Sequence, residues 1–422
     1  MPDAPANPLT EALPPGFAPL ELEPYRRAGG YSGLAAALAL PPTEVTARVK
    51  AANLRGRGGA GFPTGLKWSV LPLGANAARP KYIVVNADEM EPGTFKDRLL
   101  MERNPHLLLE GIAICAHAVE AEVAYIFLRG EYVLSAQRLE QALQAARAAR
   151  LFDFVQIHLH TSAGRYMCGE ETGMLNALEG KRANHRTKPP YPGASGLWGK
   201  PTVVNNVESL CNVPGILRWG VDWYHNLSHT QDGGSKLYGV SGMVATPGLW
   251  EMPMGSTVAE ILDRAGGMRP GHKLRGLLPG GASTAFLTPD HLDVRMDFNE
   301  VQKAGSRLGT GTMIVLDDQS CPVGMVANLI HFFAQESCGW CTPCWSGLGW
   351  ADRLLQALEA GAGNPGDLEK LEQLAGFWGP GATFCALAPG AADPLASSLK
   401  YFREDYESHI SQHHCSYGGG RE

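Results

Sequence analysis

The sequence predicts an α/β fold that is followed by a small β-rich domain and a C-terminal helical bundle. Strands and helices alternate through the first half of the chain, which is typical of a layered α/β structure. From Lys236 onward the pattern is that of a hairpin followed by one helix. Beyond Pro322 the chain is almost entirely helical, and helices of this length favour a bundle.

The α/β part contains three strand-like runs separated by helical runs. Residues 82–89, 124–131 and 155–162 are rich in β-branched and aromatic side chains, which favour strands. Helical periodicity occupies residues 104–119 and 135–151, so the alternation of a parallel α/β sheet is present. A further helix is expected ahead of the first strand, over PPTEVTARVKAANL.

The remaining segments set the expected domain boundaries. The start of the chain is rich in proline and alanine, which indicates an extended arm rather than a domain. The hairpin is expected over KLYGVSGMVATPGLWEMP and the helix after it over TVAEILDRAGG. We therefore expect four parts: an arm over 1–35, an α/β domain over 36–234, a β-domain over 235–318, and a helical bundle with a tail over 319–422.

Composition excludes several classes of function. The chain has 422 residues, of which 44% are hydrophobic and 18% charged, as in ordinary globular proteins. A net charge of −6 argues against a general nucleic-acid binder. The most apolar stretch, residues 107–128, is interrupted by charged side chains and is not expected to span a membrane. The start has no signal-peptide pattern, so we expect a cytoplasmic protein that reaches a membrane only through partners.

Four cysteines form the most specific motif. Cys338, Cys341 and Cys344 are spaced three residues apart, and Cys385 follows at a distance. Closely spaced thiolates joined by one from a remote segment match the ligands of an iron–sulfur cluster. Structural zinc is the alternative, although zinc sites more often use two separated cysteine pairs, or cysteine with histidine. The other cysteines show no ligand spacing and are expected in the core: Cys115, Cys168, Cys211, Cys321 and Cys415.

A glycine-rich loop lies ahead of the first strand. In GRGGAGF, residues 56–62, closely spaced glycines allow backbone N–H groups to converge on an anion such as a phosphate. Arg55, Arg57 and Lys67 add positive charge on both sides. Because a helix precedes the glycines, the motif differs from the Rossmann fingerprint, and a purely structural turn is the alternative.

Polar side chains follow two of the predicted strands. NADEMEPG, from residue 86 onward, lies at the carboxyl end of the first strand, where open α/β sheets bind ligands. CGEET, residues 168–172, opens a helix after the third strand, and its carboxylates either complement the helix dipole or hold a cofactor. Segment 188–210 is long and rich in proline and glycine, so we interpret it as a functional loop.

Together, these motifs resemble one known family. The glycine loop, NADEMEPG, CGEET, NNVE and the cysteine set occur in a fixed order between about residues 40 and 410. The chain resembles the NADH-binding, flavin-containing subunit of respiratory complex I (NADH-quinone oxidoreductase), called the F subunit in bacteria and the 51-kDa subunit in mitochondria. The resemblance implies a Rossmann-like domain for FMN and NADH, a ubiquitin-like β-grasp domain, and a bundle that carries a [4Fe–4S] cluster.

The resemblance also implies roles for individual residues. The glycine loop with Lys67 would cradle the FMN phosphate, and Phe62, Glu91, Lys188 and Tyr191 would face the nucleotide. The cluster ligands would be Cys338, Cys341, Cys344 and Cys385. The implied cofactor-binding set is Gly56, Arg57, Gly58, Gly59, Gly61, Phe62, Lys67, Asn86, Asp88, Glu89, Glu91, Gly169, Glu170, Glu171, Lys188, Tyr191, Asn205 and Asn206.

The implied activity is NADH oxidation within a proton-translocating complex. Hydride would pass directly from NADH to FMN, so no side chain is expected to act as a catalytic acid or base. Single electrons would then pass to the [4Fe–4S] cluster and on to partner subunits. The implied partners are the [2Fe–2S] subunit of the NADH-oxidising module and the large iron–sulfur subunit of the peripheral arm, on the cytoplasmic side of the bacterial inner membrane. The carboxylate of Glu91 predicts a preference for NADH over NADPH.

Two positions depart from the family pattern. Trp345 follows the third cysteine, where arginine is common, and the loss of that cation is expected to lower the cluster potential. Val70 stands where some members have phenylalanine. Neither change affects the ligand set.

Three other functions are weighed against this interpretation. The nearest is the diaphorase subunit of a soluble NAD-linked hydrogenase or formate dehydrogenase, many of which carry extra iron–sulfur modules for which this chain has no room. A zinc-stabilised scaffold without flavin is disfavoured because the cofactor residues and the four cysteines are intact. Nucleic-acid binding by the Gly/Arg loop is disfavoured by the acidic balance of the chain.

Overall fold

A computed structural model describes residues 4–417, which divide into two compact units. The chain crosses between the units more than once, so each unit combines separate segments. The first unit holds the residues up to Met90, Phe95–Tyr238 and Trp250–Ser256, and the second holds Glu91–Thr94, Gly239–Leu249 and the residues from Thr257 onward.

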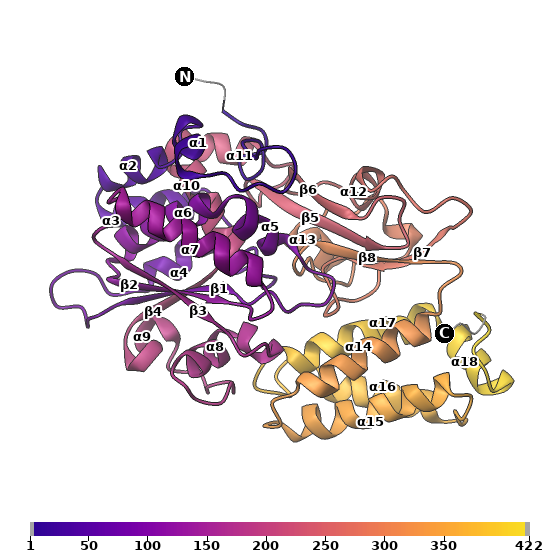
Figure 1. The fold of residues 1–422 in the computed structure, drawn as a ribbon. Coiled ribbons are helices and arrows are strands. Elements are labelled where there is room, and N and C mark those ends of the chain that lie inside the picture. The colour runs from indigo at the N-terminus through magenta and orange to yellow at the C-terminus, as the bar shows by residue number, and fades with distance from the viewer. Residues whose placement is uncertain (1–3, 418–422) are drawn as a thin grey trace. The chain divides into compact units, whose positions relative to one another are not determined.

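The first unit is built on a four-stranded parallel sheet (Figure 1). Its order is β3-β2-β1-β4, so the chain runs outward from β1 through β2 to β3 and then returns to add β4 on the other side of β1. The topological switch therefore lies between β1 and β4, where ligands bind in open α/β sheets. The strands are β1 (Tyr82–Ala87), β2 (Val123–Leu128), β3 (Gln156–Thr161) and β4 (Thr202–Asn206).

Helices cover both faces of this sheet, because Ile83 and Val85 of β1 lie in one core with residues of α6 (Pro105–Val119), whereas Val84 lies in a second core with residues of α8 (Glu171–Leu178). The central helix α6 has apolar side chains on all sides, and it is buried almost throughout, in contact with β1 and α10 (Val207–Trp219). Proline opens α6 and Glu120, in the left-handed conformation, ends it. The other helices are α1 (Leu22–Arg27), α2 (Ser32–Leu38), α3 (Pro42–Ala51), α4 (Thr64–Ser69), α5 (Lys96–Arg103), α7 (Val133–Ala148), α8 (Glu171–Leu178), α9 (Pro192–Ser195) and α11 (Val221–Asn226), with 3₁₀ turns at Tyr166–Gly169 and Leu197–Gly199.

The start of the chain differs from the extended arm that its composition predicts. Helices α1 and α2 form there, and Leu9, Tyr25 and Leu34 are buried in the core of the first unit. The carboxylate of Glu110, on α6, accepts hydrogen bonds from the Tyr25 hydroxyl (2.5 Å) and from the backbone N–H groups of Tyr31 (2.7 Å) and Leu34 (2.9 Å). The burial of these apolar side chains and the hydrogen bonds to Glu110 therefore order the N-terminal segment, although it is rich in proline and alanine.

Segment 188–210 also differs from the loop that was expected. Its second half forms β4 and the start of α10, and only the part before Thr202 is irregular or in short helical turns. The strand has only five residues and passes directly into a helix. The residues before it are rich in proline and glycine, and their pattern outweighs that of so short a strand. The run TVV was the available strand signal, because β-branched residues favour strands.

A second, smaller sheet has strands of mixed direction. The strand order is β6-β5-β8-β7, and β5 is parallel to β8 whereas β7 is antiparallel to it. Helix α12 begins with a capping box between Thr257 and Glu260. The predicted hairpin is present as β5 and β6, and the helix predicted after it is α12, but a second short helix, α13, was not predicted. These elements are β5 (Ser235–Gly242), β6 (Gly248–Pro253), α12 (Val258–Arg264), β7 (Leu274–Leu278), β8 (Thr312–Asp317), α13 (Phe298–Lys303) and a 3₁₀ turn at Pro289–His291.

A helical bundle completes the second unit. Helix α14 packs against α15 and α17, and α16 packs against both α15 and α17. The last predicted helix is two helices, because the backbone leaves helical geometry at Phe402. The bundle consists of α14 (Pro322–Glu336), α15 (Thr342–Glu359), α16 (Asp367–Phe377), α17 (Leu387–Tyr401) and α18 (Arg403–Gln412). No helix within residues 4–417 is long and apolar enough to cross a membrane.

Replacing Glu110 with alanine tests how the N-terminal segment is held. The substitution leaves the Tyr25 hydroxyl and two backbone N–H groups without their acceptor. A buried donor without a partner costs about 1–3 kcal/mol, so we expect the free energy of unfolding to fall by at least about 3 kcal/mol. Urea unfolding measures this loss. The control Glu140→Ala, on the exposed side of α7, should change stability by less than about 0.5 kcal/mol; equal effects of the two substitutions would contradict the assignment.

Candidate functional site

Three of the sequence motifs meet at the carboxyl edge of the first sheet. Asn86 at the end of β1 lies opposite Asn206 at the end of β4, which places both at the topological switch. The glycine loop approaches the same point, because the backbone N–H of Arg57 donates to the Ser209 hydroxyl (2.8 Å). A Cβ added to Gly58 would lie 3.1 Å from the Cβ of Asn206, so the loop backbone packs closely on the end of β4.

The loop also depends on glycine for its conformation. Gly59 and Gly61 have φ of 120° and 65°, a region that side chains strongly disfavour. The CGEET motif joins this edge through Asn86, whose amide donates to the carbonyl of Gly169 (2.8 Å). The structure therefore gathers the ends of β1 and β4, the glycine loop and the segment before α8 in one place.

Charged side chains line this edge. The Lys67 ammonium lies 3.1 Å from the carbonyl oxygen of Val204 and 3.5 Å from the Glu171 carboxylate. Lys188 donates to Glu171 (2.7 Å) and to Glu170 (3.3 Å). Burial alone would raise the pKa of Glu171, but Lys67 and Lys188 outweigh it and lower that pKa. The carboxylate therefore stays ionised and holds both lysines in place.

Two aromatic side chains remain available for stacking. Phe62 is 49% exposed and Tyr191 is 63% exposed, although aromatic residues are usually buried. The Lys67 ammonium lies 5.9 Å from the centre of the Phe62 ring. An exposed aromatic face beside cationic groups and glycine backbone fits the ring and phosphates of a nucleotide.

Some of the predicted contact residues are used inside the protein instead. The guanidinium of Arg57 is fully buried and donates to the carbonyl oxygens of Gly233 (2.8 Å) and Ser235 (3.1 Å). Glu89 is buried as well, and its carboxylate accepts from the N–H groups of Asp97 (2.9 Å) and Arg98 (3.0 Å). Both side chains therefore hold the segments around the site in shape, and a contact of either residue with the cofactor stays a prediction.

The polar side chains at the ends of the strands have similar supporting bonds. The Asn206 side chain caps α10 by accepting from Glu208 N–H (3.0 Å), and it donates to Asp97 (2.7 Å). Asn205 accepts from the Trp68 indole (2.9 Å). Asp88 accepts from the Ser162 hydroxyl (2.7 Å). These bonds fix the carboxyl edge of the sheet before any ligand arrives.

A buried cluster of charges lies beneath the glycine loop and was missed by sequence reasoning. The Glu208 carboxylate accepts from Lys96 (3.0 Å) and Lys236 (3.1 Å), and all three side chains are almost completely buried. Lys96 also pairs with Asp97 (2.8 Å). Burial alone would raise the pKa of Glu208, but the lysines outweigh it and lower that pKa to about 2. The available signal was the pair Lys96–Asp97 directly after NADEMEPGTF.

Glu91 belongs to the second unit. Its carboxylate accepts from the N–H of Ser283 (2.6 Å), and a Cβ added to Gly281 would lie 2.6 Å from Glu91 Cγ. Its implied position near the nucleotide stays a prediction.

The four predicted cluster cysteines lie at helix ends of the bundle. Cys338 is in the turn after α14, Cys341 precedes the first residue of α15, Cys344 is in the first turn of α15, and Cys385 lies just ahead of α17. Burial raises the pKa of the Cys344 thiol to about 11, so a cationic group is needed to hold it as a thiolate. A set of four cysteines with half-buried members fits an iron–sulfur cluster near the surface of the bundle.

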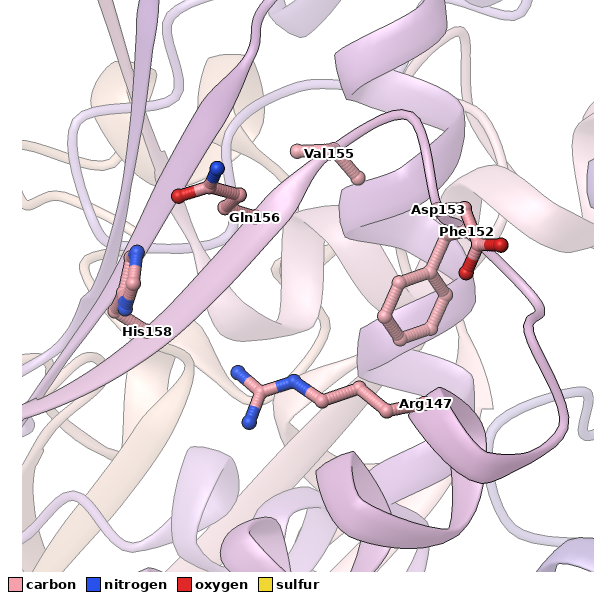
Figure 2. A pocket seen from close by; sticks show the side chains of 6 residues that line it. All are labelled: Arg147, Phe152, Asp153, Val155, Gln156 and His158. Atoms are coloured by element: carbon pink, nitrogen blue, oxygen red, sulfur yellow. The ribbon is translucent and has the colours of Figure 1, made fainter.

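A separate hollow lies at the opposite end of the first sheet (Figure 2). It begins where β3 begins, at the amino edge, whereas the motifs gather at the carboxyl edge. None of the predicted site residues lines it, so we do not assign it a role in the site. Its lining residues are Arg147, Phe152, Asp153, Val155, Gln156 and His158.

Comparisons with known proteins agree with this geometry. Residues 49–215 match the family model of the Nuo51 FMN-binding domain, residues 324–409 match the NADH-ubiquinone oxidoreductase-F iron–sulfur binding region, and residues 237–287 match the SLBB domain. The F subunit of NADH-quinone oxidoreductase from Salmonella typhimurium is 55% identical over 96% of this chain and 93% of its own length. The corresponding protein of Streptomyces coelicolor is 48% identical over 94% of this chain and 89% of its own length.

A solved structure is also similar. A chain of an NAD⁺-reducing [NiFe]-hydrogenase in the H₂-reduced state aligns with a TM-score of 0.83 and 36% identity. The alignment covers 90% of this chain but only 65% of the hydrogenase chain, which is therefore substantially longer.

The fold, the site and the matched families define a flavin- and iron–sulfur-binding subunit of an NADH-oxidising complex. With 55% identity over nearly its whole length, the chain belongs to the family of NADH-quinone oxidoreductase F subunits. The predicted family, fold class, FMN and [4Fe–4S] cofactors are confirmed. The individual site residues and the domain boundaries stay predictions.

Replacing Gly58 with alanine tests the close approach of the loop. The new methyl group would press on Asn206, and overpacking of this kind costs about 1–3 kcal/mol. We therefore expect the dissociation constant of FMN to rise by about 5- to 140-fold, because 1.4 kcal/mol is tenfold. Recovery of flavin fluorescence on dilution measures it. The control is Gly376→Ala, in α16, where an added Cβ meets nothing within 4 Å; unchanged FMN retention in Gly58→Ala would show that the loop does not depend on this contact.

Proposed function

We propose that this chain is the NADH-oxidising subunit of a respiratory, proton-translocating NADH–quinone oxidoreductase. The observation that carries the proposal is the meeting of the glycine loop, Asn86 and Asn206 at the switch point of the first sheet. The second unit of the same chain brings the four cysteines. A two-electron carrier and a one-electron carrier on one polypeptide fit the conversion of hydride into single electrons.

The side chains of the site bind and orient rather than transfer protons. When bound, FMN accepts a hydride from NADH and releases its electrons one at a time. Backbone N–H groups of residues 58–61 would bind phosphate oxygens, and Lys67 would neutralise their charge. The exposed ring of Phe62 would stack on the nicotinamide ring and Tyr191 would hold the nucleotide, which would align donor and acceptor. No acid or base is required.

The partners are proposed from the surface around the cysteines. Trp340, Trp345 and Phe384 are each more than half exposed beside the four cysteines, and exposed apolar groups of this size mark interaction surfaces. We assign this surface to a neighbouring iron–sulfur subunit that accepts electrons. The expected partners are the [2Fe–2S] subunit of the NADH-oxidising module and the large iron–sulfur subunit of the peripheral arm, on the cytoplasmic side of the bacterial inner membrane.

A diaphorase subunit of a soluble hydrogenase is the second candidate. The alignment with a chain of an NAD⁺-reducing hydrogenase favours it, whereas 55% identity with an F subunit of NADH-quinone oxidoreductase over nearly full length favours the respiratory complex. The two candidates share the same chemistry at this chain. Identification of the subunits that co-purify with it separates them.

Removing one cluster ligand tests the proposed division of labour. In the assembled complex, Cys385→Ala should lower the iron content by about four per chain. It should also abolish quinone reduction, while FMN is retained and still bleached by NADH. The control Cys115→Ala, in the core of α6, should leave the iron content unchanged. Unchanged iron in Cys385→Ala would exclude this residue as a ligand, and a wild-type complex without flavin bleaching by NADH would overturn the proposed function.

Replacing Glu91 with glutamine tests the preference for NADH. The 2′-phosphate of NADPH would meet a carboxylate in the native protein, and like charges at an interface oppose binding. We expect the NADH/NADPH ratio of kcat/KM to fall by at least about tenfold, or roughly 1.4 kcal/mol. Glu300→Gln, at the exposed ion pair of α13, is the control. An unchanged ratio in Glu91→Gln would exclude Glu91 from nucleotide selection.

A further inference from the structure

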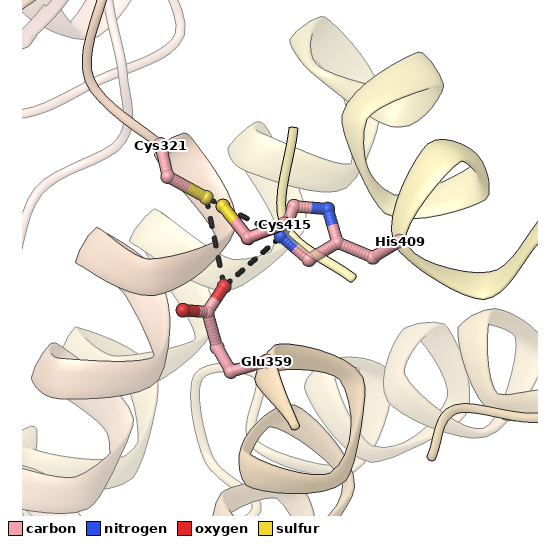
Figure 3. Close-up of side chains that lie close together, drawn as sticks. All are labelled: Cys321, Glu359, His409 and Cys415. Atoms are coloured by element: carbon pink, nitrogen blue, oxygen red, sulfur yellow. Dashed lines mark hydrogen bonds and ion pairs between the residues drawn. The ribbon is translucent and has the colours of Figure 1, made fainter. Parts of the chain in front are cut away.

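Four side chains from separate parts of the helical bundle meet at one point (Figure 3). This point lies at the start of α14 and the end of α15, whereas Cys338 and Cys341 lie at the opposite ends of these helices. Cys321 precedes α14, Glu359 is the last residue of α15, His409 lies in α18, and Cys415 follows α18. Each offers one ligand atom, and these atoms all lie within 4.8 Å of one another. The sequence did not reveal this group, because its members are far apart along the chain and show no ligand spacing.

Three of the distances within this group match those of a tetrahedral zinc site. The Cys321 Sγ lies 3.5 Å from both the Glu359 Oε1 and the His409 Nε2. The His409 Nε2 lies 3.1 Å from the Glu359 Oε1. Zinc bonds are about 2.3 Å to sulfur and about 2.0–2.1 Å to nitrogen and oxygen. In a tetrahedral site these bonds place sulfur about 3.5 Å from a nitrogen or oxygen ligand, and nitrogen about 3.3 Å from oxygen. The ligand atoms of Cys321, His409 and Glu359 are therefore spaced as three ligands of one zinc ion, and the Cys415 Sγ lies within 4.8 Å of each of them.

The ring of His409 is oriented as a metal ligand. Its Nδ1 lies 2.7 Å from the backbone carbonyl oxygen of Asp405, which can only accept, so Nδ1 carries a proton. In the neutral ring, the lone pair of Nε2 then points at the Glu359 carboxylate, which is also an acceptor. The two acceptors need a cation or a proton between them, and a backbone bond at the far nitrogen is the usual support of a zinc-binding histidine.

The two sulfur atoms are also held in place. The N–H of Gly324 donates to the Cys321 Sγ (3.2 Å) at the start of α14 and so fixes the position of this sulfur atom. The Tyr417 hydroxyl donates to the Asp405 carboxylate and accepts from Arg275. These bonds hold the segment that carries Cys415 against α18 and β7. The His413 ring adds a bond to the carbonyl oxygen of Gly361 (3.3 Å), just beyond α15.

We propose that Cys321, Glu359, His409 and Cys415 bind one Zn²⁺ as a structural ion that fastens the C-terminal segment to the bundle. Two thiolates, one imidazole and one carboxylate suit zinc, whereas magnesium and calcium take oxygen ligands. All four positions are filled by protein, so the site is structural rather than catalytic. It is separate from the [4Fe–4S] cluster and does not depend on the proposed function.

Metal analysis of the full-length protein in its assembled complex tests this proposal. We expect about one zinc per chain, as in a single four-ligand site. The extended X-ray absorption fine structure at the zinc edge should show two sulfur neighbours and two nitrogen or oxygen neighbours. Absence of zinc after incubation of the metal-depleted complex with ZnCl₂ would overturn the proposal. Zinc surrounded by four sulfurs would also overturn it, because that ion would occupy the cluster cysteines.

Variants separate the two metal sites. Cys415→Ala should lose zinc and keep its iron, whereas Cys385→Ala should lose iron and keep its zinc. His414→Ala, at an exposed neighbour of the same segment, is the matched control and should keep both metals. Flavin content and its bleaching by NADH report whether each variant is folded. Retention of zinc in Cys415→Ala, or a Cys321–Cys415 disulfide found by mass spectrometry in the untreated complex, would contradict the proposal.

Discussion

The buried carboxylate of Glu208 connects the segments that shape the cofactor edge of the first unit. It lies between Lys96, which follows NADEMEPG, and Lys236, at the start of β5. Burial lowers the pKa of Lys236 to about 8, while at Lys96 the carboxylates outweigh burial and raise the pKa. Removing one member of such a group leaves the others uncompensated, at a cost of about 3–5 kcal/mol. The pairing therefore fixes three distant segments together.

The cofactor site depends on this arrangement. Glu208 lies in the first turn of α10, whose cap is Asn206 and whose Ser209 receives the glycine loop. Arg57 sends its side chain into the same interior, so its backbone is left to shape the loop. The surface needed for phosphate binding is thus built from backbone groups over a rigid charged interior, while Phe62 and Tyr191 stay exposed for stacking.

Local motifs predicted the parts of the site, and long-range pairing determined how they are used. Cys338, Cys341 and Cys344 were found because their spacing is local, and Asn86 because it ends a clear strand. The pairing of Glu208 with Lys236 was not predicted, because no feature of the sequence around either residue indicates that both are buried and paired. Strand β4 was missed for a different reason, because its five residues directly follow a run that is rich in proline and glycine. Cys321 and His409 are 88 residues apart, so no local pattern connects them.

A double-mutant cycle on Glu208 and Lys236 tests this account most directly. FMN retention and urea unfolding would be measured for Glu208→Gln, Lys236→Met and the double variant. The account predicts that each single substitution weakens FMN retention, and that the double variant loses less than the sum of the two, by at least about 1 kcal/mol. Strictly additive effects, or single variants that retain FMN as tightly as the native protein, would contradict the claim that this buried pairing positions the cofactor edge.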